Sequence, residues 1–188
     1  YGSRAASGVV MITTKTGKKN KGLGIEYNGG LQWSTILRLP EFQNEFGMGW
    51  NGDHTELENG SWGPRFDGSM QLWGNKYENS QKLKPYSPIK NNIKDFFDAG
   101  FRYNNSVSFN GATDKSEYYV SFSQISDDGM VPTDADSYDK YTFSARGSHK
   151  VKALTFSSSL NYSYQKNKFA TTGQGLTMLN SLYQTPRD

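Results

Sequence analysis

The alternation of apolar and polar side chains in residues 154–165, LTFSSSLNYSYQ, constrains the fold of this chain most. Successive side chains of an extended strand point to opposite faces. One face therefore carries Leu154, Phe156, Leu160, Tyr162 and Tyr164, and the other carries only Thr, Ser, Asn and Gln. An ordinary soluble sheet usually turns Lys, Glu or Arg towards water. The segment therefore predicts a strand with one apolar face and one uncharged polar face.

Four earlier segments show the same period of two. Their apolar members are Leu23, Ile25, Tyr27, Leu31 and Trp33; Val107 and Phe109; Tyr118, Val120 and Phe122; and Tyr141, Phe143 and Ala145. None of these stripes has Lys or Arg in its middle, where a transmembrane strand would lose about 2–4 kcal/mol for such a charge facing lipid. The pattern predicts about five strands of an antiparallel meander.

The links between these segments alternate between short and long. The link 111–116 contains the Gly and Asp of a hairpin turn, and 149–153 is also short. The links 127–139 and 35–103 are long. Short turns at one end and long loops at the other are typical of an outer-membrane barrel. The loop 35–103 is expected to be ordered and functional, with one short helix over 89–99.

Composition excludes several classes of protein. The chain has no cysteine, so disulfide scaffolds and thiol chemistry are excluded. Its formal charge of +3 does not indicate nucleic-acid binding. It has no apolar run of the length needed for a membrane-spanning helix, but barrel strands of about 9–11 residues leave only a weak hydropathy signal. Two interpretations remain open: a wall of a transmembrane β-barrel, and a secreted carbohydrate-binding β-sandwich with a Ser-rich outer face.

Several separated motifs occur in one order along the chain. They are Tyr1–Lys18 (YGSRAASGVVMITTKTGK), Leu39-Pro40, Trp62-Gly63-Pro64-Arg65, Asp67-Gly68, Asn91-Asn92, Phe96-Phe97, Gly100 and the final Pro186-Arg187-Asp188. In this order they resemble the end of the plug domain and the first barrel strands of SusC/RagA-type TonB-dependent outer-membrane transporters. One departure is Ser7, where that family often has Asn.

The resemblance implies an all-β fold in which residues 1–17 end a plug domain and residues 18–188 form the N-terminal portion of a β-barrel of about 22 strands, with the long extracellular loop 35–103. It implies a fragment of a bacterial outer-membrane importer without enzymatic activity. The implied partners are TonB, through a segment outside this chain, a SusD-like surface lipoprotein, outer-membrane lipid, and an oligosaccharide or peptide as cargo.

The residues that suggest cargo contact lie in the long loop. Trp50 and Trp62 offer aromatic faces for sugars or peptide side chains, and Arg65 offers a bidentate donor for carboxylates. Together with Asp67 they form the predicted substrate site. A purely structural turn at 62–68 is the favoured alternative, because Gly-Pro and Asp-Gly are turn formers.

Other chemical motifs are weaker. The match to G-x-G-x-x-G at 47–52 has no buried strand before it and no helix after it, so we interpret it as coincidence in a Gly-rich loop. A calcium site at Asp134, Asp136 and Asp139 and a glycosidase pair at Glu56 and Glu58 are less favoured than solvated loop acids. The sequence therefore predicts no catalytic residue, no metal site and no cofactor.

Overall fold

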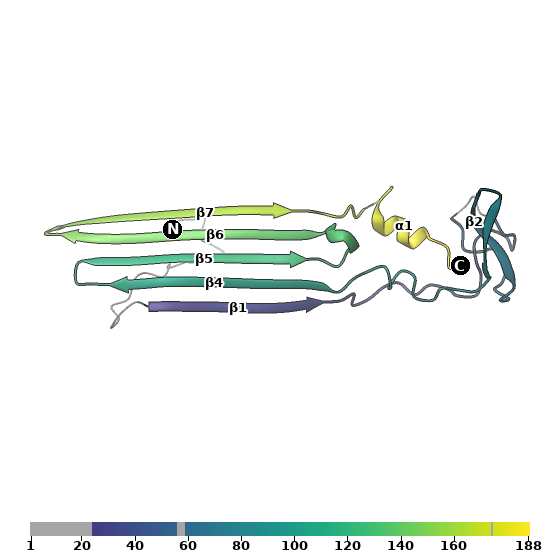
Figure 1. The fold of residues 1–188 in the computed structure, drawn as a ribbon, viewed down its shortest axis with the longest axis horizontal. Coiled ribbons are helices and arrows are strands. Elements are labelled where there is room, and N and C mark those ends of the chain that lie inside the picture. The colour runs from purple at the N-terminus through teal and green to yellow at the C-terminus, as the bar shows by residue number, and fades with distance from the viewer. Residues whose placement is uncertain (1–23, 56–58, 174) are drawn as a thin grey trace, which may run out of the picture. The chain divides into compact units, whose positions relative to one another are not determined.

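The computed structural model describes residues 24–55, 59–173 and 175–188 (Figure 1). These residues form two units: one comprises 24–32, 102–127 and 138–167, and the other comprises the remaining described residues. The expected plug end, residues 1–17, lies outside the described residues.

The first unit is a single antiparallel sheet with the strand order β1-β4-β5-β6-β7 (Figure 1). Its strands are β1 (Gly24–Ser34), β4 (Gly100–Ala112), β5 (Ser116–Asp128), β6 (Ser137–Val151) and β7 (Leu154–Asn167). The five-stranded antiparallel meander predicted from the alternating segments is therefore confirmed. The strands extend beyond the alternating segments, because residues next to the apolar stripes also join the ladders. The open sheet is compatible with a fragment of a β-barrel wall.

The register of β6 and β7 shows how the two faces of the sheet differ. Phe143 lies opposite Tyr162, Ala145 opposite Leu160, and Val151 opposite Leu154. The intervening pairs place Thr142 opposite Ser163, Ser144 opposite Asn161, and Ser148 opposite Ser157. Because directly opposed residues share a face, one face of this hairpin is apolar over most of its length and the other is polar.

Contacts between side chains extend this division across all five strands. On the apolar face, the Tyr27 hydroxyl donates to Asn105 Oδ1 at 2.6 Å, which joins β1 to β4. Three rings then stack across neighbouring strands, with centroid distances of 6.4 Å between Phe122 and Tyr141 and 6.5 Å between Tyr141 and Tyr164. We call the side that carries these rings the apolar face, and the opposite side the polar face.

The polar face has its own contacts. The Arg102 guanidinium lies 3.8 Å from an Asp127 carboxylate oxygen, and the Arg146 guanidinium lies 5.8 Å from the centre of the Tyr119 ring. The Arg102 and Asp127 pair lies near the strand ends, whereas Arg146 lies opposite Ser159, well inside β7. Most other side chains in the middle of the polar face are small and neutral: Asn28, Asn104, Ser106, Ser121, Ser123, Thr142, Ser144, Asn161 and Ser163.

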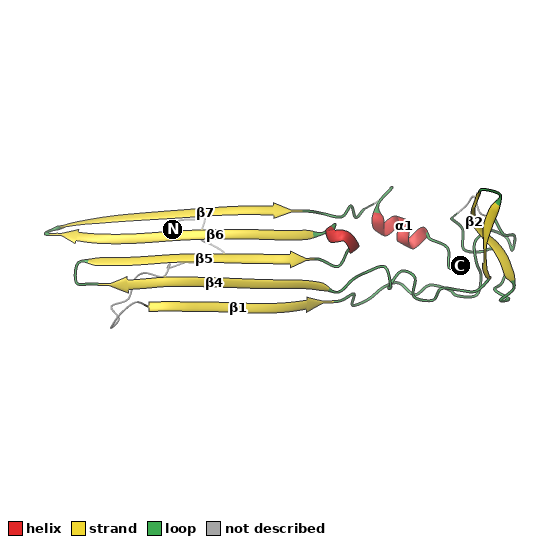
Figure 2. Ribbon diagram, in the orientation of Figure 1, coloured by secondary structure: helices red, strands yellow, loops and turns green. Residues whose placement is uncertain are grey.

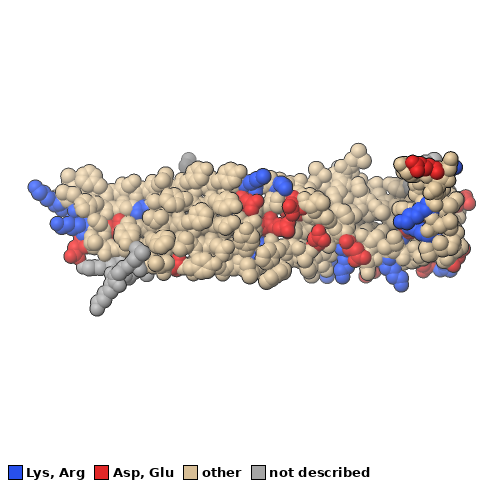
Figure 3. Space-filling model, in the orientation of Figure 1, with Lys and Arg blue, Asp and Glu red and all other residues tan. Residues whose placement is uncertain are grey.

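The apolar face is uncovered. The side chains of Phe156, Leu160 and Tyr162 are 62%, 58% and 61% exposed, and Leu31 in β1 is 63% exposed. Figure 3 shows the visible side of the sheet mainly as uncharged atoms. Both buried hydrophobic side chains of the described residues, Tyr86 and Ile93, belong to the second unit. The sheet therefore has no core of its own within the described chain.

The second unit contains the long loop, and the structure adds a hairpin there that the sequence did not indicate. Strands β2 (Met70–Tyr77) and β3 (Ser80–Pro85) pair antiparallel, with Leu72 opposite Leu83 (Figure 2). Glu78 and Asn79 turn the chain with positive φ angles of 46° and 59°. The unit also contains a 3-10 turn, η2 (Pro132–Asp134), and a short helix, α1 (Met178–Gln184), whose first turn is capped by the Thr177 side chain.

The helix expected over 89–99 is replaced by successive turns, and the α-helix of the described residues is α1 instead. The Ile89 amide donates to the Arg187 carbonyl at 2.7 Å, and the Asn92 side chain donates to the Pro186 carbonyl at 3.2 Å. These long-range hydrogen bonds tie the 89–92 segment to residues 186–187. None of the described helices is long and apolar enough to cross a membrane.

Candidate functional site

The predicted cargo residues lie on two loop segments that pair with each other. Phe46 forms an antiparallel bridge with Arg65, and Gly49 forms a parallel bridge with Ser61. The Gly49 amide donates to the Gly60 carbonyl at 2.9 Å, and the Trp62 amide donates to the Gly49 carbonyl at 3.0 Å. The loop is therefore ordered by its backbone, which agrees with the expectation of an ordered loop region.

Trp62 and Arg65 lie together around one aromatic ring. The centroids of the Phe46 and Trp62 rings are 5.7 Å apart, and the Arg65 guanidinium lies 5.9 Å from the centre of the Phe46 ring. Glu45 accepts a hydrogen bond from Arg65 at 2.5 Å. We call Glu45, Phe46, Trp62 and Arg65 the Trp62 cluster. Its net charge is zero, because Glu45 neutralises Arg65, and 56% of Trp62 remains exposed.

Trp50 is held beside this cluster by a tight turn. The amide of Trp50 donates to the Asp53 carbonyl at 3.1 Å, and the Asp53 amide donates back at 2.9 Å. Asn51 and Gly52 have positive φ angles of 53° and 85°, as a two-residue hairpin turn of the Asn-Gly type requires. The Trp50 ring covers Gly60, where a Cβ atom would lie only 2.3 Å from the ring. The position of Trp50 therefore depends on glycine at 60.

Asp67 has a different role in the structure from Trp62 and Arg65. Its carboxylate accepts hydrogen bonds from the Ser69 amide at 2.9 Å and the Ser69 hydroxyl at 2.7 Å, and these bonds hold the pKa of Asp67 below its usual value. Gly68 follows with a φ angle of 76°. The arrangement is a side-chain-stabilised turn, so the carboxylate of Asp67 is engaged within the loop.

Tyr86 supports the Trp62 cluster from inside the loop. Its hydroxyl donates to the Pro64 carbonyl at 2.8 Å, and its ring lies 4.8 Å from the Phe66 ring. Only 3% of Tyr86 is exposed, and this burial raises the pKa of its phenol. Sequence reasoning did not identify Tyr86 because the Pro-Tyr-Ser-Pro context gives no periodic signal.

A second centre, also not identified from the sequence, surrounds Arg187. Only 3% of this residue is exposed, although it is charged. Its guanidinium donates to Asn92 Oδ1, to Asn44 Oδ1 at 3.0 Å and to the Lys90 carbonyl at 2.7 Å, and it lies 5.3 Å from the centre of the Phe42 ring. Desolvation lowers the pKa of Arg187. Arg187 thus joins three segments of the second unit that are far apart in the sequence.

The acidic residues considered for calcium bind separate protein groups. The Asp136 carboxylate accepts from the amides of Met130 and Val131 at 2.9 and 2.8 Å. Asp139 accepts from the Ser126 hydroxyl at 2.7 Å. Asp134 hydrogen-bonds the side chain of Asp128 and raises the pKa of that carboxyl. Among the described residues, no three His, Asp or Glu side chains are arranged to hold a metal ion.

The comparison with known proteins gives one relevant similarity. Over 178 residues the chain is 24% identical to the TonB-dependent receptor SusC of Bacteroides thetaiotaomicron, which covers 94% of this chain and 16% of that protein. The chain thus spans about a sixth of the length of this relative. No protein-family model matches the chain. The similarity, with the uncovered antiparallel sheet, supports a distant relationship to TonB-dependent receptors.

Proposed function

We propose that this chain is part of a TonB-dependent transporter of the SusC/RagA type that imports glycans or peptides across the bacterial outer membrane. The uncovered apolar face of the five-stranded sheet carries this proposal. A soluble sheet of this size covers such a face with a second layer. In a transmembrane barrel the same face meets lipid, and the polar face lines a hydrated interior.

The length of the apolar stripe fits a bilayer. From Leu154 to Tyr164 in β7, and from Val151 to Tyr141 in β6, the stripe covers ten residue steps. At about 3.3 Å per residue this is about 33 Å along the strand. With a strand tilt of about 40°, the stripe spans about 25 Å along the membrane normal, which is the height of the apolar band of outer-membrane barrels.

Groups at the long-link end of this stripe fit a membrane interface. The stacked Phe122, Tyr141 and Tyr164 rings lie at the end of the sheet from which the long links leave, as an aromatic girdle would. Beyond them, Asp139 lies opposite Lys166, so charged residues resume past the girdle. On this assignment the long loop is extracellular and the short turns are periplasmic.

The Trp62 cluster supports contact with cargo. Its exposed indole, its zero net charge and the neighbouring Trp50 suit stacking on a neutral glycan ring or a peptide side chain. We extend the proposal to Trp50, Trp62 and Arg65 as cargo-contacting residues, with Asp67 shaping the loop that presents them. TonB, acting through a segment outside this chain, and a SusD-like surface lipoprotein are the proposed partners.

Site-directed spin labelling of the full-length protein in lipid vesicles tests the sidedness directly, and this chain has no cysteine that would interfere. Single cysteines replace Leu160 and Asn161, which are neighbours on opposite faces. We expect the label at 160 to be accessible to oxygen dissolved in lipid, and the label at 161 to be protected from it. Equal access to a water-soluble relaxation agent at both positions, or recovery of the protein as a detergent-free periplasmic species, would refute the proposal and favour a soluble sandwich.

A further inference from the structure

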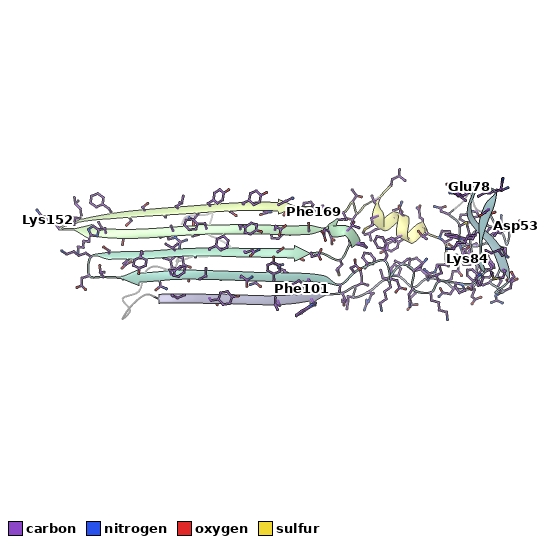
Figure 4. All side chains as sticks on the ribbon, in the orientation of Figure 1. Asp53, Glu78, Lys84, Phe101, Lys152 and Phe169 are labelled. Carbon is purple, nitrogen blue, oxygen red and sulfur yellow. The ribbon has the colours of Figure 1, made fainter. Side chains whose placement is uncertain are left out.

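A hollow on the polar face extends across β5, β6 and β7. Its volume of about 340 Å³ is within the range of small-molecule sites. The polar-face side chains of its lining are Glu117 and Tyr119 from β5, Arg146 and Ser148 from β6, and Ser157 and Ser159 from β7. Figure 4 shows Lys152 at the turn of the β6–β7 hairpin, and the hollow lies in the half of both strands nearer to this turn.

These side chains form two rows across the strands. Arg146 lies opposite Ser159, and Ser148 lies opposite Ser157. The Arg146 guanidinium lies 5.8 Å from the centre of the Tyr119 ring, so Tyr119 extends the first row onto β5. Residues two positions apart along a strand are about 6.6 Å apart. The residues between the rows turn their side chains to the apolar face, so backbone forms the floor of the hollow.

The composition of the hollow differs from that of the rest of the polar face. Most other side chains in the middle of this face are small and neutral, whereas Arg146 is charged and carries an aromatic ring beside it. Its partner in the ladder, Ser159, lies midway between Leu154 and Tyr164, which limit the apolar stripe of β7. Ionisable groups that face the interior at membrane depth commonly mark the path of a substrate or an ion.

The groups in the hollow suit a neutral ligand that is rich in hydroxyl groups. Arg146 and Glu117 carry opposite charges, so the lining as a whole selects neither an anion nor a cation. The three serine hydroxyls both donate and accept, whereas the guanidinium only donates and the ionised carboxylate only accepts. The Tyr119 ring adds apolar surface. A sugar ring matches this set, because it has hydroxyls around its edge and C–H groups on its faces. A peptide group has one donor and one acceptor and would leave most of these hydroxyls unpaired.

We propose that this hollow binds one neutral sugar ring of the cargo. Arg146, Glu117 and the serine hydroxyls bind the sugar hydroxyls, and the Tyr119 ring contacts the C–H groups. The inference rests on the proposed function, because the polar face is the inner wall of a transporter only on that assignment. It selects a glycan over a peptide as cargo, and it adds a contact on the wall itself to the proposed contacts on the long loop.

Saturation-transfer difference NMR of the full-length protein in detergent tests this site, with glucose, galactose and mannose as probes. The measurements use Trp50→Ala with Trp62→Ala as the background, because this removes the proposed loop contacts. We expect saturation transfer to at least one hexose in this background. Adding Arg146→Gln should weaken binding by about tenfold, because hydrogen bonds from a charged donor are lost. Arg102→Gln is the matched control, since Arg102 lies on the same face but pairs with Asp127 near the strand ends, and it should leave the affinity unchanged.

A second variant removes hydroxyl groups and leaves the charge unchanged. Ser148→Ala with Ser157→Ala and Ser159→Ala should also weaken hexose binding, because three donors and acceptors of the hollow are lost. Its matched control, Ser121→Ala with Ser144→Ala and Ser163→Ala, removes the same number of hydroxyls from the polar face outside the hollow. This control should bind hexose as the background protein does.

Several results would overturn the sugar site. They are the absence of binding by all three hexoses, and unchanged binding in both the Arg146→Gln and the serine variants. Tighter binding of galacturonate than of galactose would mean that Arg146 selects an anion, and equal binding of triglycine would mean a peptide site. Fractionation of the same preparations separates the two proposals. A protein absent from the outer membrane refutes the proposed function, whereas an outer-membrane protein that binds no hexose in the hollow refutes this site alone.

Discussion

Replacing Leu160 by arginine should lower the free energy of unfolding, and the size of this loss should depend on the depth of residue 160 in the bilayer. Leu160 lies six residue steps from Leu154 and four from Tyr164 on the same face of β7. At about 3.3 Å per step and a tilt of about 40°, these are about 15 Å and 10 Å along the membrane normal. Leu160 therefore lies near the middle of an apolar band of about 25 Å.

An arginine at this depth on the lipid face costs about 2–4 kcal/mol. We therefore expect Leu160→Arg to lower the free energy of unfolding by that amount. Asn161→Arg is the matched control, because it places the same side chain one residue away at the same depth but on the polar face. Its cost should be much smaller. Leu154→Arg, at the edge of the band, should cost about 0–1 kcal/mol.

The free energies can be measured by guanidinium unfolding of the full-length protein in phospholipid vesicles, with tryptophan fluorescence as the signal. The expected order of destabilisation is Leu160→Arg, then Leu154→Arg, with Asn161→Arg causing little change. If Asn161→Arg were as costly as Leu160→Arg, or if 154 and 160 were equally sensitive, depth and sidedness would not control the effect. The membrane assignment of the sheet would then be wrong.

Three further predictions concern the second unit. Arg187→Gln should lower the stability of the long loop by about 2–4 kcal/mol, because hydrogen bonds from a buried charged group are lost. Pulse proteolysis of the full-length protein measures this loss of stability, and unchanged cleavage of the loop would contradict the prediction. The hydrogen bond to Asp134 raises the pKa of Asp128 in the folded protein. The protonated Asp128 therefore stabilises the fold below the unfolded pKa of 3.8, and this contribution is lost as the pH rises through the folded pKa. Asp128→Asn should protect the 129–136 loop from proteolysis at neutral pH relative to wild type, and the difference should disappear at acidic pH. Trp62→Ala should reduce cargo uptake severalfold at unchanged outer-membrane abundance, whereas Trp73→Ala should not; equal uptake by both variants would remove Trp62 from the cargo site.

The sheet was predictable because its information is local. Alternate residues indicate the two faces of each strand. Leu160, Asn161 and Tyr162 are consecutive, and they are apolar, polar and apolar in turn. A shift of one residue would exchange the faces of the whole strand, so the pattern excludes such shifts, whereas shifts of two residues keep the faces and the exact register came only from the structure. The short turn between β4 and β5 was predictable from its local residue types as well, although the structure narrows it to Thr113, Asp114 and Lys115 and places Gly111 within β4.

The hairpin of β2 and β3 was not predictable from such signals. Its turn uses Glu78 and Asn79 at positive φ, without the glycine that usually marks a two-residue turn. In β2 it carries Trp73, whose ring centre lies 4.4 Å from the Lys84 ammonium group in β3. That contact links two strands through a pair of residue types that each occur commonly on surfaces, so neither one alone indicates a strand.

The loop around Arg187 shows why the parts proposed to bind cargo are harder to predict than the wall. Arg187 contacts Asn92 and Asn44, which are 95 and 143 residues away in the sequence. Nothing in the residues next to Arg187 indicates that its charge is buried, because its partners are neutral amides and a carbonyl rather than a carboxylate. A strand facing lipid can be encoded residue by residue, since its environment is the same at every position of the stripe. A loop that must present Trp62 in one place obtains its environment from distant segments, and only the folded chain brings these together.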